Sequence, residues 1–116
     1  MRTYRTALTK SELVYLRALE KAQTTGEIAQ RLGVAKPSVS RALDNLHAKR
    51  LAVREEGGAT LSAQGREVSA ALSPCVEAIA AQLRECGFRK CEEIACGIVS
   101  SFGAETERLL KICAEG

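Results

Sequence analysis

Two short helix patterns joined by a tight turn constrain the fold of this chain more than any other feature. The segment TTGEIAQRLG places Thr24 and Glu27 at the spacing of a capping box, and Gly33 is a typical residue at a helix end. After the turn GVAKP, Pro37 falls in the first turn of the next helix, where its missing N–H costs nothing. We therefore expect a short helix over residues 25–32, a four-residue turn and a further helix.

The segments on either side of this pair predict more helices and one small hairpin. Thr9 and Glu12 repeat the capping-box spacing ahead of an apolar helical pattern, which predicts a helix over residues 10–22. LAVREEGGATLS alternates apolar and polar residues around the reversal Gly57-Gly58, as in a β-hairpin. Beyond the hairpin, the pattern predicts helices over 63–86 (restarted or kinked at Pro74), 91–101 and 104–114.

This order of elements is that of a winged helix-turn-helix. With two Tyr, two Phe and no Trp among 116 residues, the core has to be built from aliphatic side chains, which favours helices. We predict a mainly α fold with a small β-hairpin wing. Residues 1–62 would form the winged helix-turn-helix domain and residues 63–116 a helical dimerisation region. A chain of this size buries only about two-thirds of its unfolded surface, so a dimer is a natural way to complete the core.

The charge of the chain is divided unevenly along its length. Residues 1–65 hold eleven Lys and Arg against six Asp and Glu, whereas residues 66–116 hold six against eight. A basic first half fits a nucleic-acid partner. No apolar run approaches the roughly 20 residues that cross a bilayer, and the N-terminus lacks a signal-peptide pattern. We therefore expect a cytoplasmic protein with no membrane partner, in which the five cysteines form no disulfide framework.

The third predicted helix carries the candidate DNA contacts. Its apolar stripe leaves serines beside Lys36 and Arg41 on the other faces, and such side chains can enter a major groove. Hydroxyl and N–H groups at the start of the second helix could bind a phosphate. The hairpin tip is acidic, so only Arg54 at its base suits DNA and we expect the wing to contribute little. The predicted DNA-binding residues are Thr24, Thr25, Lys36, Pro37, Ser38, Ser40, Arg41, Asn45 and Arg54.

The stretch TTGEIAQRLGVAKPSVSRALDNLHAKRL, followed by GGATLSAQGREV, resembles the iron- and manganese-dependent repressors related to the diphtheria toxin repressor. The resemblance extends from about Ser11 to Val68, and KPSVSRAL is its most specific part. Regulators of the multiple-antibiotic-resistance type share the winged fold and are the second candidate. The resemblance implies a homodimeric transcriptional regulator that binds an inverted repeat in double-stranded DNA, with one third helix reading each half-site.

The same resemblance implies where metal ligands would lie. The positions on the first helix are Val14 and Arg17, which cannot serve, and the single histidine, His47, lies at the far end of the third helix. A site built on imidazoles is therefore excluded. What remains is a thiolate-bound transition metal, such as zinc, copper(I) or an iron–sulfur cluster. Its candidate ligands are Cys75, Glu92, Glu93 and Cys96.

The five cysteines leave three interpretations open, namely packing, a thiolate metal or cluster site, and redox sensing. Helical spacing places Cys91 on an apolar stripe that we expect to be core, and Cys96 roughly 125° from the centre of that stripe. The stripe consists of Cys91, Ile94, Ala95, Ile98 and Phe102. Cys75 and Cys86 are about 16 Å apart along their helix and cannot bind one ion together. Cys113 is expected on the apolar face of the last helix.

The sequence lacks the parts of an enzyme. It has one histidine, no Ser-His-Asp set and no phosphate-binding glycine loop. Two function hypotheses remain, from different classes. The first is a DNA-binding transcriptional regulator, which would respond to a metal or to oxidation if the cysteines form a sensing site. The second is a winged-helix protein-interaction module of a larger assembly, without specific DNA contact. The basic first half and the polar face of the third helix favour the first hypothesis.

Overall fold

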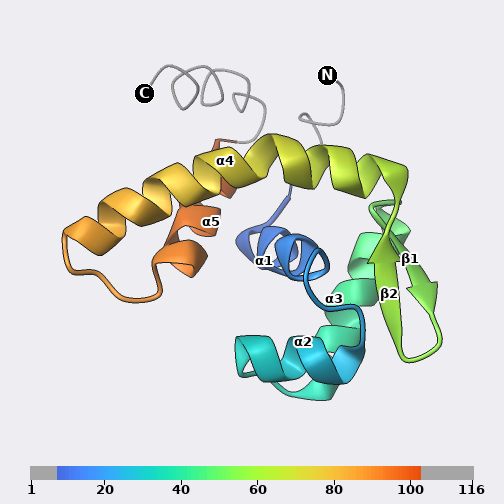
Figure 1. Cartoon of the computed structure of the whole chain (residues 1–116). Helices are drawn as coiled ribbons and strands as arrows, with labels where there is room; N and C mark the ends of the chain where they lie inside the picture. Colours follow the sequence, from blue (N-terminus) through green and yellow to red (C-terminus); the bar gives the residue numbers. More distant parts are fainter. Residues whose placement is uncertain (1–7, 103–116) are drawn as a thin grey trace.

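The computed structural model describes residues 8–102, which form five helices and one antiparallel hairpin. Helix α4 arches over α1, α5 folds back beneath the second half of α4, and α2 and α3 lie on the other side of α1 (Figure 1). The predicted mainly α fold with a hairpin wing is confirmed. In chain order the elements are α1 (Lys10–Ala18), α2 (Thr25–Leu32), α3 (Lys36–Ala48), β1 (Ala52–Glu55), β2 (Gly58–Leu61), α4 (Ala63–Glu85) and α5 (Cys91–Ser101).

Helix α1 starts as predicted but ends earlier. The Thr9 side chain accepts a hydrogen bond from the Glu12 N–H, and the Glu12 carboxylate accepts one from the Thr9 N–H, which completes the capping box. The predicted end near residue 22 is wrong, because α1 stops at Ala18. The chain has to become extended before Thr24, since Gln23 pairs with the wing through a hydrogen bond from the Ala59 N–H to its carbonyl oxygen at 3.0 Å.

Helices α2 and α3 form the predicted helix-turn-helix. A second capping box, between Thr24 and Glu27, starts α2, and Gly33 ends it in the left-handed conformation at φ 68°. Helix α3 has Pro in its first turn, where no N–H is needed. The apolar faces of both helices meet α1 in one core. Its fully buried members in α1, α2 and α3 are Leu13, Leu16, Ile28, Val39, Leu43 and Leu46.

The wing is a hairpin of two four-residue strands, in which Ala52 lies opposite Leu61 and Glu55 lies opposite Gly58. Gly57 supplies the positive φ of 79° that the turn requires. Gly58 is needed for a different reason, since a Cβ added there would lie 1.9 Å from the Gln23 carbonyl oxygen. The hairpin therefore touches the start of α2 with its backbone, and an isolated bridge joins Thr24 to Gly58.

Helix α4 is a single helix of 23 residues that continues through Pro74 and curves along its length (Figure 1). The predicted restart does not occur. Ser62 caps its first turn by accepting a hydrogen bond from the Gly65 N–H at 2.9 Å. None of the described helices is long and apolar enough to cross a membrane. The predicted helix over 104–114, with Cys113, lies outside the described residues.

Helix α5 buries only part of the predicted apolar stripe, and its buried side is rotated away from Ile94 and Ile98. The prediction that Cys91 is core is confirmed. The buried residues are Cys91, Ala95, Cys96 and Val99, whereas Ile94, Ile98 and Phe102 are each 37% exposed. Helix α5 packs against both α4 and α1, so its buried sector extends around the helix toward α1. The prediction that Cys96 lies away from the core is therefore wrong, because its side chain is only 2% exposed.

Candidate nucleic-acid interface

Helix α3 separates an anchored face from an exposed face. Val39, Leu43 and Leu46 are fully buried against the core, which fixes the helix in place. Most of the predicted contact residues lie on the remaining faces. Ser38, Arg41 and Asn45 are spaced by three and four residues, so they share one side of the helix. Lys36, Pro37, Ser38, Arg41 and Asn45 are exposed, and Ser40 is half-buried.

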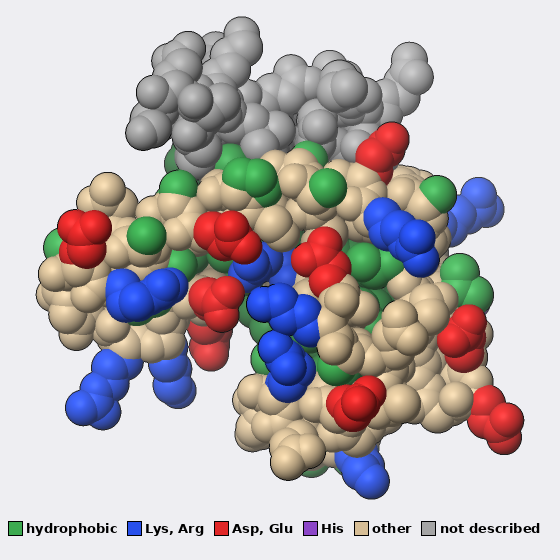
Figure 2. Space-filling model, in the orientation of Figure 1, with side chains coloured by type: hydrophobic (Ala, Val, Ile, Leu, Met, Phe, Trp, Pro, Cys, Tyr) green, Lys and Arg blue, Asp and Glu red, His purple; other side chains and the backbone are tan. Residues whose placement is uncertain are grey.

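Arg54, the one cation of the wing, bonds to α3. Its guanidinium donates to the Ser40 carbonyl oxygen at 3.1 Å and pairs with Asp44 at 3.5 Å. The side chain is half-buried between the hairpin and the helix. In this arrangement Arg54 holds the wing against α3. The tip itself carries the exposed acidic residues Glu55 and Glu56, and Figure 2 shows acidic side chains over the hairpin.

The two threonines at the start of α2 are engaged within the chain. The Thr24 hydroxyl accepts from the Glu27 N–H and donates to the Glu27 carboxylate, which holds the pKa of Glu27 below its usual value. The Thr25 hydroxyl and N–H both donate to the Gly57 carbonyl oxygen, at 3.1 and 2.8 Å. The Thr25 bonds fix the start of α2 to the wing, whereas the Thr24 bonds cap α2 itself.

The predicted metal ligands do not converge in the structure. Among residues 8–102 no group of three or more His, Cys, Asp or Glu side chains could hold one ion. Glu92 pairs with Arg17 at 3.3 Å, and Glu93 pairs with Lys10 at 3.1 Å. Cys75 and Cys96 are both buried in the core.

The thiols differ in their exposure. Burial raises the pKa of Cys96, although the charge of nearby Arg17 and its hydrogen bond act in the opposite direction. Cys91 is also buried, and its thiol donates to the Phe88 carbonyl oxygen at 3.0 Å. Cys86, at the C-terminal end of α4, is the exposed thiol of the described residues. Burial with a raised pKa keeps Cys96 protonated and unreactive near neutral pH.

Three polar contacts between the helices could not be deduced from periodicity. Arg17 reaches from α1 to α4 and α5 with hydrogen bonds at 3.1 to 3.3 Å. The Lys49 ammonium pairs with Glu12 at 2.7 Å, which ties α3 to α1. The fully buried Ser69 donates to Glu20 at 2.7 Å, which ties α4 to the end of α1. The only sequence signal for any of them is Arg17 itself, a cation at a position where the family resemblance implies a metal ligand.

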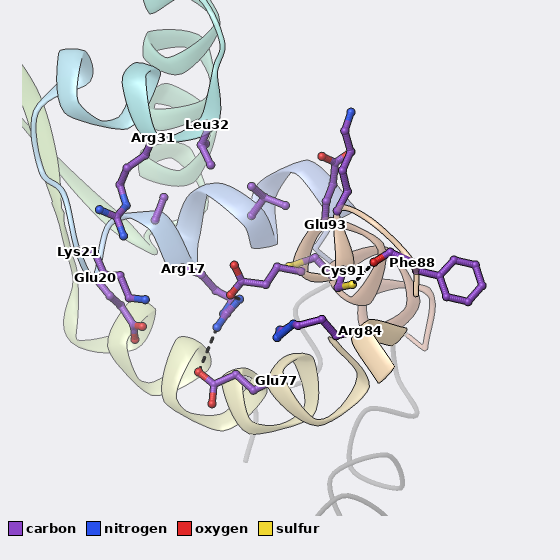
Figure 3. A pocket seen from close by; sticks show the side chains of 15 residues that line it. Arg17, Glu20, Lys21, Arg31, Leu32, Glu77, Arg84, Phe88, Cys91 and Glu93 are labelled. Carbon is purple, nitrogen blue, oxygen red and sulfur yellow. Dashed lines mark hydrogen bonds and ion pairs between the residues drawn. The ribbon is translucent and has the colours of Figure 1, made fainter. Parts of the chain in front are cut away.

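A cavity of about 770 Å³ lies beside these contacts, between α1, α2, α4 and α5. Figure 3 shows Arg17 extending from α1 toward Glu77 on α4, with Arg84 pointing into the same space. Val14, Ala18 and Leu32 provide its apolar part. The acidic residues of its lining are occupied, since Glu77 and Glu92 bond to Arg17, Glu93 to Lys10 and Glu20 to Ser69.

Comparison with known proteins agrees with a winged helix-turn-helix. Residues 8–59 match the profile of the MarR family. The match covers α1, α2, α3 and the hairpin as far as the start of β2. The matched family is the multiple-antibiotic-resistance type, which was the second candidate from the sequence. No curated protein matches the chain. The profile match supports a regulator and not an enzyme, and the shared fold supports the winged helix-turn-helix.

Three solved structures share the fold at low sequence identity. A hypothetical protein from Sulfolobus solfataricus is 21% identical with a TM-score of 0.56, over 94% of this chain and 92% of that one. ScaR with bound Zn²⁺ is 23% identical with a TM-score of 0.59, over 90% and 54%. IdeR from T. acidophilum is 24% identical with a TM-score of 0.56, over 93% and 53%. The chain thus spans about half the length of the ScaR and IdeR chains.

Proposed function

We propose that this protein is a sequence-specific DNA-binding transcriptional regulator that acts as a homodimer on an inverted-repeat operator. The observation that carries the proposal is the division of α3 into a buried apolar face and an exposed polar face with Ser38, Arg41 and Asn45. An arginine can bond two acceptors of guanine at once, and an asparagine can do the same with adenine. The profile match over residues 8–59 supports the same class.

The assignment of phosphate contacts follows the geometry. Lys36 is exposed at the first residue of α3, where a cation can reach the DNA backbone. Thr24 and Thr25 have their hydroxyls in internal bonds, so we assign them the role of orienting α2. Arg54 has the corresponding role for the wing, through Ser40 and Asp44. Base contacts are therefore expected to come from α3.

Dimerisation is proposed through the region of residues 63–116. Ile94, Ile98 and Phe102 follow one another along α5 and are each 37% exposed, which gives this helix a second apolar side. Apolar side chains grouped in this way are typical of protein interfaces. Two copies joined through this region would place one α3 on each half-site of a palindromic operator.

A metal or redox response through the cysteines is a separate part of the hypothesis. The buried thiols Cys75 and Cys96 would have to be uncovered to bind an ion, and Glu92 and Glu93 would have to leave their cations. Metal analysis of protein purified without oxygen, compared with Cys96→Ala, tests this part. Stoichiometric metal that is lost in the variant would establish a thiolate site.

A gel-shift titration at two salt concentrations tests DNA binding against the protein-interaction module. A regulator that neutralises phosphates should lose affinity steeply as salt rises, with a slope set by the number of phosphate contacts. The DNA should be selected from random fragments so that no operator is assumed. Enrichment of a palindromic sequence would support a homodimer on an inverted repeat. Failure to retain any DNA at low salt would favour the interaction module.

A further inference from the structure

Arg17 connects three of the five described helices through one side chain. From α1, its Nε donates to the Ser73 hydroxyl on α4 at 3.1 Å, and its Nη2 pairs with Glu77 on the same helix at 3.3 Å. Its Nη1 pairs with Glu92 on α5, also at 3.3 Å. The Cys96 thiol lies close enough for the guanidinium to influence its pKa. The three nitrogens of one planar group thus have partners on two different helices.

The burial of Arg17 makes these contacts more significant than those of an ordinary surface pair. Its side chain is 13% exposed, whereas those of Glu77 and Glu92 are 68% and 62% exposed. A largely buried cation is costly unless it is paired and hydrogen-bonded. The rigid fork of arginine can satisfy several acceptors in fixed directions, which the point charge of lysine cannot. Displacing α1 from α4 and α5 would therefore leave this charge without its partners.

The surroundings of Arg17 do not fit a metal ion. The acceptors that face this space are the carboxylates of Glu77 and Glu92, the Ser73 hydroxyl and the Cys96 thiol. A guanidinium already lies among them, and no group of three potential ligands is placed for one ion in the described part of the chain. ScaR, which shares the fold at 23% identity, has Zn²⁺ bound.

We propose that Arg17 is a permanent internal cation that fixes the DNA-reading helices against α4 and α5, so that operator binding needs no added metal. The effect of Arg17 on operator binding rests on the proposed DNA-binding function, whereas its role in holding α1 against α4 and α5 does not. In this role Arg17 is a positioning residue, because it lies on α1, which packs on α3, and touches no DNA-facing side chain in the described structure. A regulator built in this way would have its α3 helices set for binding in every metal condition.

The first experiment measures operator affinity with EDTA and then with Mn²⁺ or Zn²⁺ added. We expect the wild-type dissociation constant to agree within about twofold across these conditions. Arg17→Met, similar in length but uncharged, should weaken binding by about tenfold at a temperature where circular dichroism shows it folded. Arg17→Lys should recover part of the loss, because it restores the charge but not the fork.

Arg84→Met is the matched control. Arg84 reaches from α4 into the same cavity, is exposed, and has no ion pair among the described residues, so its loss should leave affinity unchanged. A wild type that loses operator binding in EDTA and regains it with either metal would overturn the proposal. So would an Arg17→Met variant that is folded and binds as tightly as the wild type, since Arg17 would then only stabilise the fold.

Hydrogen exchange of the free protein separates this inference from the proposed function. Arg17→Met should speed exchange of the amides in residues 91–101 while leaving those of α3 unchanged, whether or not the protein binds DNA. Faster exchange in a protein that binds no DNA would support the positioning role and reject the proposed function. Unchanged exchange in residues 91–101 would reject the positioning role.

Discussion

Gly58→Ala should lower the free energy of unfolding by breaking the contact between the wing and the start of α2. The added Cβ would lie 1.9 Å from the Gln23 carbonyl oxygen, and real contacts of this kind are at least 3.0 Å, so the strand has to retreat by about 1 Å. Such a shift breaks the bond from the Ala59 N–H to Gln23 and the bond from the Thr25 N–H to the Gly57 carbonyl oxygen, now 3.0 and 2.8 Å.

The size of the effect follows from these two bonds. Ala59 is buried, so leaving its N–H without a partner costs about 1–3 kcal/mol, and the more exposed bond from Thr25 to Gly57 adds about 0.5–1.5 kcal/mol. The loss should therefore be about 2–4 kcal/mol in the free energy of unfolding. That is a large share of the roughly 5–15 kcal/mol that stabilise a small domain. With a urea slope of about 1.5 kcal/mol/M, the midpoint should fall by about 1–3 M.

Urea unfolding followed by circular dichroism measures this loss against two matched alanine variants. Gly57→Ala places a side chain in open space at φ 79°, so it should cost only the left-handed strain of about 1–2 kcal/mol. Gly26→Ala lies in α2, where its Cβ would meet only the Lys36 side chain at 3.6 Å, and it should be neutral or stabilise by up to about 1 kcal/mol. The reasoning is refuted if Gly58→Ala is no less stable than Gly57→Ala.

Three further predictions concern single side chains. Burial raises the pKa of Glu12, but the hydrogen bonds from Lys49 and Thr9 and the positive charge of Lys49 together outweigh it and leave the pKa below 4.5. A carboxyl group whose pKa is lowered by folding stabilises the fold at any pH above its unfolded-state pKa, so Glu12→Gln should cost about 1–2 kcal/mol at pH 7. The difference from the wild type should shrink as the pH falls below the unfolded-state pKa, and an equal cost at pH 3 would contradict this. Arg41→Ala should weaken operator binding by more than about tenfold in gel shifts, and unchanged affinity would refute base reading by α3. Alkylation of the native protein, read by mass spectrometry, should modify Cys86 quickly and Cys96 only after unfolding; equal rates would disprove the burial of Cys96.

The elements of the winged helix-turn-helix were predictable because their signals are local. Thr9 and Thr24 each form the capping box that their spacing to Glu12 and Glu27 indicates. Gly33 ends α2 in the conformation that favours glycine. In each case the hydrogen bonds lie within a few residues of one another, so sequence order is enough to determine them.

Errors occurred where a distant segment decides the conformation. Helix α1 ends four residues before the predicted residue 22, because Gln23 pairs with a hairpin more than thirty residues away along the chain. Helix α5 has apolar residues around much of its circumference, so periodicity alone could not tell which side is buried. Its contact with both α4 and α1 selected the side with Cys96 over that with Ile94 and Ile98.

The candidate site shows the same limit. The exposed residues of α3 could be listed from the sequence, since an apolar stripe leaves its complement outside. The sequence did not reveal that Arg54 bonds to α3, or that Thr25 bonds to Gly57, because both are contacts between elements. Arg54 and Thr25, which were predicted as DNA contacts from their chemistry, thus form bonds between elements of the chain.

The sequence by itself determined where helices begin, where the chain reverses and which face of α3 is polar, because caps, turns and helical periodicity act over a few residues. The tertiary structure decided what the isolated charges and thiols do. It buried Cys96, and it placed the Arg17 guanidinium between carboxylates that lie 60 and 75 residues further along the chain. The physical reason is that a buried charge requires partners in three dimensions, and the spacing of residues along a helix does not specify which other helix provides them.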